Sequence, residues 1–540
     1  MLRVAFLLLL ASTYAPGPQV LTFLSDVDDS DQPYAVYIPN QFDPKKPYPL
    51  VISLHGAYSN HRVNLRRVFG RGNLPGETDA EASRYFPKLR EVQYIVASPF
   101  ARGTLGYQGI PEKDVYDVLA DVKRRFLIDE DRIYLTGLSM GGGGALWLGL
   151  TRPDLWAAIA PVCPAVPAGT ETLAPNALHV PVHLFHGERD PVVPVSVSRQ
   201  WHKDLSELGA GVEYVEFPGV RHNSWDGAYR NAAIFDWFSR FRRVRHPERV
   251  RFVSSQYKYN RAYWVEFDGL TPGTPASIDA KFTAKNRLDV KTENLDGFTL
   301  HLDGHPQFQS GQPVDVAIDG KIVRARKLLS LVKTGKGWES GKYAPTGKRA
   351  GAEGPMGEVI AGRHVYVYGT ADSPGPEEVS RRRALASQAA EWRGATRLSL
   401  ALDVKADKDV GPRDIAGVNL VLFGTAETNS LIARHAPKLP MALNPGAADY
   451  GLAYVYPING RYVLVNSGLP FWHGIERVRS EDITAKFMPR NVHLLLSAGD
   501  YVLFRGSVEH VVAAGRFDRD WKLTPEHAGK LRSSGAIRLN

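Results

Sequence analysis

The chain has almost no cysteine and no long apolar segment. Cys163 is the single cysteine among 540 residues, which excludes an intrachain disulfide. After the first residues no run approaches the roughly 18 apolar residues that a membrane-spanning helix needs. Zinc-finger spacing, aromatic-rich RNA motifs and basic helix repeats are also missing, so we do not expect a nucleic-acid partner. No sequence feature calls for a metal or an organic cofactor, and stability must come from hydrophobic cores.

Length and composition are those of a folded protein with several domains. Hydrophobic residues make up 44% of the chain and charged residues 23%, which are ordinary globular values. At about 150 residues per domain, the length predicts two to four domains. We expect three domains after a leader at residues 1–15: an α/β domain at 30–245, a β-sandwich-like module at 250–335 and a second α/β domain of unassigned function at 355–511.

The N-terminal residues have the pattern of a secretory signal peptide. Arg3 supplies a positive charge, Val4–Ala11 is a short apolar run, and Thr13-Tyr14-Ala15 is a small-residue cleavage site. The expectation is therefore a secreted or periplasmic protein. An uncleaved N-terminal anchor is the alternative.

The net charge of +9 is partly concentrated in one short segment. Six arginines fall between Arg240 and Arg251, at the end of the first predicted domain. Such a segment could attract a polyanion such as an acidic polysaccharide. We favour the alternative that these side chains are solvated or form ion pairs between domains.

The most informative stretch runs from Asp131 to Trp147. The apolar run Ile133–Leu135 leads into Gly137-Leu138-Ser139-Met140-Gly141, and a helix-like segment follows directly. In this strand–turn–helix context the serine hydroxyl lies exposed at the top of a strained turn, where it can act as a nucleophile. Gly137 and Gly141 lack Cβ atoms, so they permit the turn and the close packing of the helix. Ser139 is the predicted nucleophile.

Two further side chains follow predicted buried strands. The strand Val182–Gly187 leads to Asp190, and the strand at 212–217 is followed by a loop that contains His222. The carboxyl ends of parallel strands meet at one edge of a sheet, where functional groups gather. The order Ser139, Asp190, His222 predicts a triad in which the histidine is the general base and the aspartate orients it.

Four other residues compete for the roles of acid and base. Glu188 and Asp226 are alternative carboxylates, and His183 and His186 are alternative bases. Both histidines lie on or beside a predicted strand, which favours a structural role. Cys163 closes another buried strand and is interpreted as a small core residue rather than a reactive thiol.

Four motifs, taken in their order along the chain, resemble those of the α/β-hydrolase superfamily. They are His55-Gly56, Gly137–Gly142, His186–Pro194 and Gly219–His222. More closely, they resemble the branch shared by prolyl oligopeptidase (S9) catalytic domains and secreted feruloyl, acetylxylan and polyhydroxyalkanoate esterases. The resemblance covers about residues 30–240. Those peptidases usually carry a β-propeller before the hydrolase domain, whereas here only about 15 residues lie between the leader and the first predicted strand.

The resemblance implies a serine hydrolase that cleaves esters through an acyl-enzyme. It also implies that the amides of Ala57 and Met140 hold the oxyanion. The expected substrate is a small-molecule or polymer ester, including one linked to a polysaccharide. An S9-type peptidase is the alternative, and a binding protein with a relic triad is the alternative from another class. The oligomeric state is not predicted.

A predicted helix at 111–126 carries three aspartates, Asp114, Asp117 and Asp121. Their spacing could hold a metal, but it equally suits a solvated helix face, and we favour the solvated face.

Two later segments suggest binding sites. From about residue 250 the hydrophobic period becomes two, and Asp319-Gly320 is a hairpin signal, which together predict a β-sandwich. Tyr263 and Trp264 in this module could stack on a sugar, although an aromatic core is the favoured interpretation. The turn at 424–429 joins a predicted strand to a helix and could hold an anion.

Overall fold

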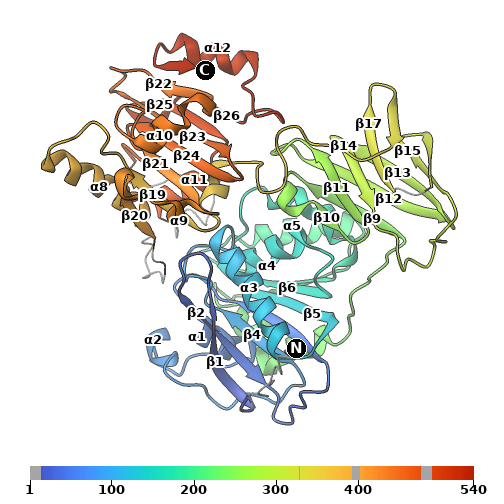
Figure 1. The fold of residues 1–540 in the computed structure, drawn as a ribbon. Coiled ribbons are helices and arrows are strands. Elements are labelled where there is room, and N and C mark those ends of the chain that lie inside the picture. The colour runs from blue at the N-terminus through green and yellow to red at the C-terminus, as the bar shows by residue number, and fades with distance from the viewer. Residues whose placement is uncertain (1–13, 327–328, 392–399, 401, 476–488) are drawn as a thin grey trace, which may run out of the picture.

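The computed structural model describes residues 14–540 except 327–328, 392–399, 401 and 476–488. The predicted leader therefore lies almost wholly outside the described residues, as does the start of the strand expected at 398–404. Among the described helices, none has the length and apolar character needed to cross a membrane. Figure 1 shows three sheet-based units: a blue-to-green N-terminal unit, a yellow-green β-sandwich beside it, and an orange-to-red C-terminal unit.

The N-terminal unit is built on an eight-stranded sheet with the order β1-β2-β4-β3-β5-β6-β7-β8. β1 and β2 are antiparallel to their neighbours, and the other strands run parallel. Sequence patterns predicted every strand except β1. The strands are β1 (Gly17–Leu24), β2 (Asp31–Ile38), β3 (Tyr48–Leu54), β4 (Ile95–Pro99), β5 (Ile128–Leu138), β6 (Ala158–Val162), β7 (Val182–Gly187) and β8 (Val212–Phe217).

Helices cover both faces of this sheet. α3, α4 and α5 contribute to the apolar core on one face, and α1, α6 and α7 contribute to the core on the other. The central strands are buried throughout, as expected for parallel strands covered on both sides. The helices are α1 (His61–Val68), α2 (Asp79–Ala82), α3 (Ile110–Arg125), α4 (Met140–Thr151), α5 (Ser196–Glu207), α6 (Trp225–Ala228) and α7 (Ala233–Phe238), with 3-10 turns η1 (Thr170–His179) and η2 (Arg230–Ala232).

The prediction of a solvated aspartate face on α3 is wrong for Asp114 and Asp121, whereas Asp117 is partly exposed and pairs with Lys113 on the same helix. Asp114 is fully buried and pairs with Arg102, whose guanidinium also contacts Asp28. Asp121 is buried as well and pairs with Arg125. These carboxylates are therefore used in ion pairs that hold the α3 helix in place, and neither the solvent nor a metal is needed to explain them.

The middle unit consists of two five-stranded sheets that share one core, as predicted. Asp319 and Gly320 both have positive φ, which suits the tight hairpin between β15 and β16. The strands are β9 (Arg249–Ser254), β10 (Arg261–Ala262), β11 (Val265–Leu270), β12 (Ala276–Ala284), β13 (Arg287–Glu293), β14 (Leu295–Leu300), β15 (Val314–Ile318), β16 (Lys321–Ala325), β17 (Ser330–Thr334) and β18 (Gly337–Ser340), with the 3-10 turn η3 (Tyr257–Tyr259).

Tyr263 and Trp264 are core residues of this unit rather than a sugar platform. Trp264 is 1% exposed and donates its indole N–H to the carbonyl of Pro247. Tyr263 is buried and donates its hydroxyl to the carbonyl of Pro153 in the N-terminal unit. Neither ring has a free face for a sugar.

The arginine-rich segment forms ion pairs. Arg240 pairs with Glu213, and Arg243 and Arg245 both pair with Asp131. Further along, Arg249 and Arg251 pair with Asp279 of the β-sandwich. These five arginines therefore form ion pairs, but the pairs lie within the N-terminal unit or within the β-sandwich and not between domains as expected.

The C-terminal unit contains a seven-stranded mixed sheet with the order β20-β19-β21-β24-β23-β25-β26 and a small β22–β27 pair. Strand pairing thus continues beyond residue 511. The strands are β19 (His364–Tyr368), β20 (Asp403–Ala406), β21 (Asn419–Phe423), β22 (Met441–Leu443), β23 (Tyr450–Ile458), β24 (Arg461–Gly468), β25 (Tyr501–Arg505), β26 (Ser507–Gly515) and β27 (Ile537–Leu539). The helical segments are η4 (Met356–Val359), α8 (Pro376–Ala390), η5 (Asp407–Asp409), α9 (Pro412–Ile415), α10 (Ser430–His435), η6 (Ala436–Lys438), α11 (Arg490–Ser497) and α12 (Pro525–Ser533).

Candidate active site

Ser139 lies at the turn between β5 and α4, with φ 55° and ψ −116°. A non-glycine residue in this region is strained, as in the nucleophile turns of serine hydrolases. A Cβ on Gly137 would lie 2.1 Å from the carbonyl oxygen of Gly141, and a Cβ on Gly141 would lie 2.3 Å from that of Leu54. Both glycines are therefore required by the close approach of strand and helix, as the sequence predicted.

The structure brings the three predicted side chains together. The Nε2 atom of His222 lies 2.9 Å from the Ser139 hydroxyl, and its Nδ1 atom lies 2.7 Å from Oδ2 of Asp190. Asp190 follows β7 and His222 follows β8, so adjacent parallel strands deliver both residues to the same edge as the serine. A hydroxyl, an imidazole and a carboxylate in this order can relay one proton from the serine to the histidine.

The carboxylate of Asp190 is buried but well bonded. Burial alone raises its pKa, but hydrogen bonds from His186, His222 and the amides of Val192 and Val193 outweigh burial and hold the pKa well below its usual range. The two amides donate to Oδ1 at 2.8 and 3.0 Å, which leaves Oδ2 for His222. The aspartate is therefore charged at neutral pH, as a partner for a protonated imidazole must be.

The two predicted oxyanion amides flank Ser139. Met140 follows it in the chain, and the loop that carries Ala57 approaches it closely, since a Cβ on Gly56 would lie 3.5 Å from the Cβ of Ser139. Within the described residues, neither amide donates a hydrogen bond to another group. His55 holds this loop through its contact with the carbonyl of Phe100 at 2.8 Å. Two such amides can bind a developing oxyanion.

The competing residues have other partners. Glu188 accepts the amide of Gly219, and Asp226 accepts the side-chain amide of Asn223. His183 packs against Phe185 and Trp237, and burial lowers its pKa to about 4.

Cys163 lies behind the histidine loop. Its thiol is fully buried, and the sulfur is 3.5 Å from the carbonyl oxygen of His222. One ligand atom from each of Cys163, Asp190 and His222 lies within 4.8 Å of the others, which is a geometric condition for a metal. However, burial raises the pKa of the thiol to about 12, so it stays protonated and is a poor metal ligand or nucleophile.

Sequence reasoning missed two residues beside the triad. The ring of Trp225 meets the His222 imidazole edge to face at 5.4 Å, and the Arg67 guanidinium lies over the Trp225 ring at 5.5 Å. Arg67 is itself held by Asp79 at 2.8 Å. The position of Trp225 three residues after His222 was a visible signal, whereas the place of Arg67 depends on the unpredicted α1.

The turn at 424–429 does not offer an anion site. Asn429 caps α10 by accepting the amides of Leu431 and Ile432, and the carboxylate of Asp407 accepts the amide of Ser430. The chain's own side chains therefore occupy the groups that an anion would use.

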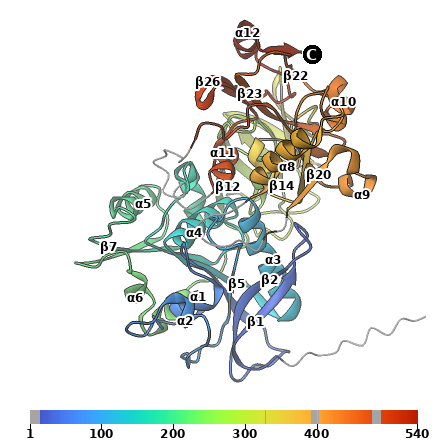
Figure 2. The same cartoon turned by 90° about the vertical axis from the view of Figure 1, so that its left-hand side faces the viewer.

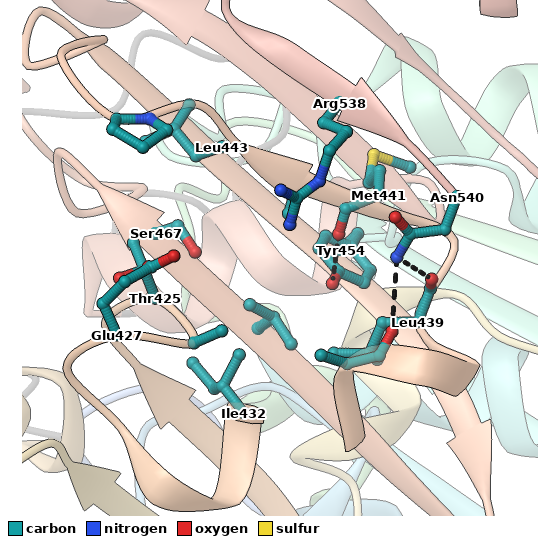
Figure 3. Close-up of a pocket in the computed structure, with 15 residues that line it drawn as sticks. Thr425, Glu427, Ile432, Leu439, Met441, Leu443, Tyr454, Ser467, Arg538 and Asn540 are labelled. Carbon is teal, nitrogen blue, oxygen red and sulfur yellow. Dashed lines mark hydrogen bonds between the residues drawn. The ribbon is translucent and has the colours of Figure 1, made fainter. Parts of the chain in front are cut away.

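A separate cavity lies in the C-terminal unit near α10 and the β22–β27 pair (Figure 3). Its lining includes the apolar side chains of Ile432 and Leu439 and the charged side chains of Glu427 and Arg538. Figure 3 shows the Arg538 guanidinium directed towards the cavity. No histidine is among its lining residues, so it lacks the nucleophile–base pairing found at Ser139.

Known proteins resemble the first part of the chain. The family model described as Phospholipase/Carboxylesterase matches residues 112–235. A protein named Probable feruloyl esterase C from Aspergillus oryzae is 28% identical over 206 residues, which cover 36% of this chain and 68% of that protein. Acyl-protein thioesterase 1 of Neurospora crassa is 29% identical over 102 residues, which cover 18% of this chain and 42% of that protein.

Solved structures of esterases are also similar. A structure named as a thermostable esterase is 29% identical with a TM-score of 0.34, and the match covers 42% of this chain and 63% of that one. A CE1 ferulic acid esterase from Anaeromyces mucronatus is 17% identical with a TM-score of 0.32, covering 43% of this chain and 92% of that one. The family match, the curated relatives and the sheet with its serine turn together identify an α/β-hydrolase domain of the esterase-like serine hydrolases in this chain.

Proposed function

We propose that this protein is an exported esterase that uses Ser139 as its nucleophile. The observation that carries the proposal is the continuous hydrogen-bonded chain from the Ser139 hydroxyl through His222 to Asp190. The strained φ of Ser139 and the unused amides of Ala57 and Met140 support the same assignment. Export is inferred from the signal-like residues 1–15.

The proposed reaction has two stages. His222 takes the proton of Ser139 while Oγ attacks the ester carbonyl, and the amides of Ala57 and Met140 bind the oxyanion. The tetrahedral intermediate collapses, the C–O bond to the alcohol breaks, and His222 returns the proton to the leaving alcohol. Water, activated by the same imidazole, then attacks the acyl-enzyme and releases the carboxylic acid. Asp190 stays ionised and stabilises the imidazolium in both stages.

For the substrate we propose a carboxylic ester with a hydroxycinnamoyl, acetyl or polyester acyl group, including one attached to a polysaccharide. The name of the Aspergillus oryzae relative supports hydroxycinnamoyl esters as the first to test.

A substrate panel tests this proposal. Purified protein and the Ser139→Ala variant would be incubated with p-nitrophenyl acetate, methyl ferulate and aminoacyl-prolyl amides. We expect hydrolysis of the esters by the wild type only, together with fluorophosphonate labelling that Ser139→Ala abolishes. Cleavage of the amides alone would assign a peptidase instead, and an unlabelled, inactive wild type would indicate a binding protein.

A further inference from the structure

The carboxylate of Asp190 touches a second imidazole that the proposed reaction does not use. His186 lies near the end of β7, and the side chains of both residues are fully buried. Its Nε2 atom is 3.4 Å from Oδ2 of Asp190 and 3.0 Å from the carbonyl oxygen of Val193. Its Nδ1 atom is 2.7 Å from the hydroxyl of Ser198 on α5.

These partners determine which ring nitrogen of His186 carries the proton. A carbonyl oxygen and an ionised carboxylate only accept hydrogen bonds, so Nε2 must be the donor. Nδ1 of the neutral ring is then an acceptor, and the hydroxyl of Ser198 donates a hydrogen bond to it. With a single proton on Nε2, both nitrogens of the buried ring have a partner, and the ring orientation is fixed.

The Nε2 hydrogen of His186 makes two contacts with the segment that carries Asp190. It donates a hydrogen bond to the carbonyl oxygen of Val193, and the amide of Val193 in turn donates to Oδ1 of Asp190. It also faces Oδ2, the oxygen that accepts the Nδ1 hydrogen of His222. His186 therefore supports both the loop and the carboxylate oxygen that faces His222.

We propose that His186 is a positioning residue for the proposed esterase reaction, which keeps the Asp190 carboxylate aimed at His222, with Ser198 fixing the His186 ring. This inference rests on the proposed function of Ser139, Asp190 and His222. His186 touches neither the serine nor the expected substrate position, so its effect must pass through Asp190.

The central test replaces His186 by Phe, which keeps a planar ring but removes the donor. We expect kcat for p-nitrophenyl acetate to fall roughly tenfold to a hundredfold, less than the loss of about 10⁴ that follows changes in a triad aspartate. KM should change less than threefold, because the ester does not contact this ring. The acidic limb of the pH profile should move to lower pH, because a displaced carboxylate stabilises the His222 imidazolium less well.

Two further variants separate positioning from folding. His186→Gln retains a donor near the Nε2 position and should recover a large part of kcat, and Ser198→Ala should lower kcat a few-fold with the fold intact. His183→Phe is the matched control, because His183 is a partly buried histidine on the same strand without a contact to Asp190, and this variant should leave kcat unchanged. If His186→Phe does not fold, the comparison of His186→Gln with Ser198→Ala still decides the matter.

The inference is overturned if His186→Phe keeps the wild-type kcat and pH profile. It is also overturned if kcat falls only in proportion to the folded fraction, or if His186→Gln loses as much activity as His186→Phe. Where His186→Phe does not fold, a wild-type kcat in Ser198→Ala overturns it. In those cases Ser139 would still be labelled by fluorophosphonate and the wild type would still cleave esters. Failure of the proposed function would instead appear as an unlabelled, inactive wild type.

Discussion

At the scale of single residues, the candidate site depends on how one buried carboxylate is bonded. The Oδ1 atom of Asp190 accepts hydrogen bonds from two backbone amides, and Oδ2 accepts one from the imidazole of His222. Since the amides fix one oxygen, the other has little freedom to turn away. These hydrogen bonds thus keep the Asp190 carboxylate ionised and also fix its orientation towards His222.

Replacing Asp190 by Asn should lower kcat for p-nitrophenyl acetate by about 10⁴-fold, because an amide N–H facing Nδ1 favours the wrong imidazole tautomer. The melting temperature should also fall, because the buried site loses a charge that several hydrogen bonds stabilise and the new N–H faces the Nε2 hydrogen of His186. Steady-state kinetics and thermal unfolding check this. Asp226→Asn is the control, because this exposed carboxylate was the alternative acid in the sequence, and it should remain fully active. Equal losses in both variants would contradict the assignment.

At the scale of elements, the junction of β5 and α4 is so closely packed that it requires glycine. α4 begins with four consecutive glycines after Met140, and a Cβ on Gly141 would run into the backbone of Leu54 and His55. Backbone atoms cannot move aside as a flexible side chain can. The strain is therefore tolerated only because the strand, the turn and the helix are held together by the cores on both faces of the sheet.

Gly141→Ala should destabilise the N-terminal unit by about 3 kcal/mol, because the new methyl group overlaps with backbone atoms. Gly529→Ala, in the exposed helix α12 where no atom lies within 4 Å of the new Cβ, should instead stabilise by about 0.5–1 kcal/mol through helix propensity. Urea unfolding of the two variants beside the wild type checks both signs. Equal effects would show that helix propensity, and not packing, governs Gly141.

At the scale of the whole molecule, one lysine connects the three units. Lys258 of η3 lies 3.4 Å from Glu112 of α3 and 3.7 Å from Glu358 of η4. The next residue, Tyr259, donates its hydroxyl to Glu112 at 2.7 Å, and Glu353 accepts the backbone amide of Lys258. Carboxylates from the N-terminal and C-terminal units thus converge on a cation of the β-sandwich.

Lys258→Met should loosen the contacts between the units, because it leaves the buried Glu112 and the partly buried Glu358 without their cation. We expect a cost of about 1–3 kcal/mol, less than for a fully buried pair, since the lysine side chain is 25% exposed. Limited proteolysis should cut the variant faster between the units. Lys113→Met, which removes a similarly exposed lysine paired only within the N-terminal unit, should be cut at the wild-type rate.

Three histidines should make the whole molecule less stable in mild acid. Burial lowers the pKa of His61 to about 3 and that of His183 and His364 to about 4. The unfolded chain binds a proton at each near pH 6.5, so it gains protons that the folded protein does not bind. The contribution of these histidines to stability should therefore fall as the pH drops from about 6.5 towards 4, whereas the buried carboxyl groups of Asp114 and Glu353, whose pKa values burial raises to about 6 and about 8, act in the opposite direction. Thermal unfolding of the wild type and of His183→Phe across this range isolates one histidine: the variant should lose less melting temperature on acidification than the wild type, and an equal or larger loss would contradict the sign.

Local patterns were sufficient to predict much of the fold. Buried strands such as Leu50–Leu54 and Val182–Gly187 were visible as short apolar runs, and the hairpin at Asp319-Gly320 as a turn pair. β1 was missed although it contains the apolar residues Val20, Leu21, Phe23 and Leu24, because it is an edge strand that pairs only with β2 and most of its side chains are only partly buried. The error over Asp114 has the same origin, since nothing within α3 indicates that Arg102 from another loop buries it.

The sequence by itself determined the turn at Ser139, the identity of its partners and their order, because glycine requirements and strand periodicity act over a few residues. Only the tertiary structure decided that His222 meets a serine 83 residues away and an aspartate 32 residues away. It also decided that His186 supports Asp190 and that Lys258 joins three units. Those contacts depend on how strands assemble into one sheet and how the units pack, and long-range packing is set by the whole chain rather than by any segment of it.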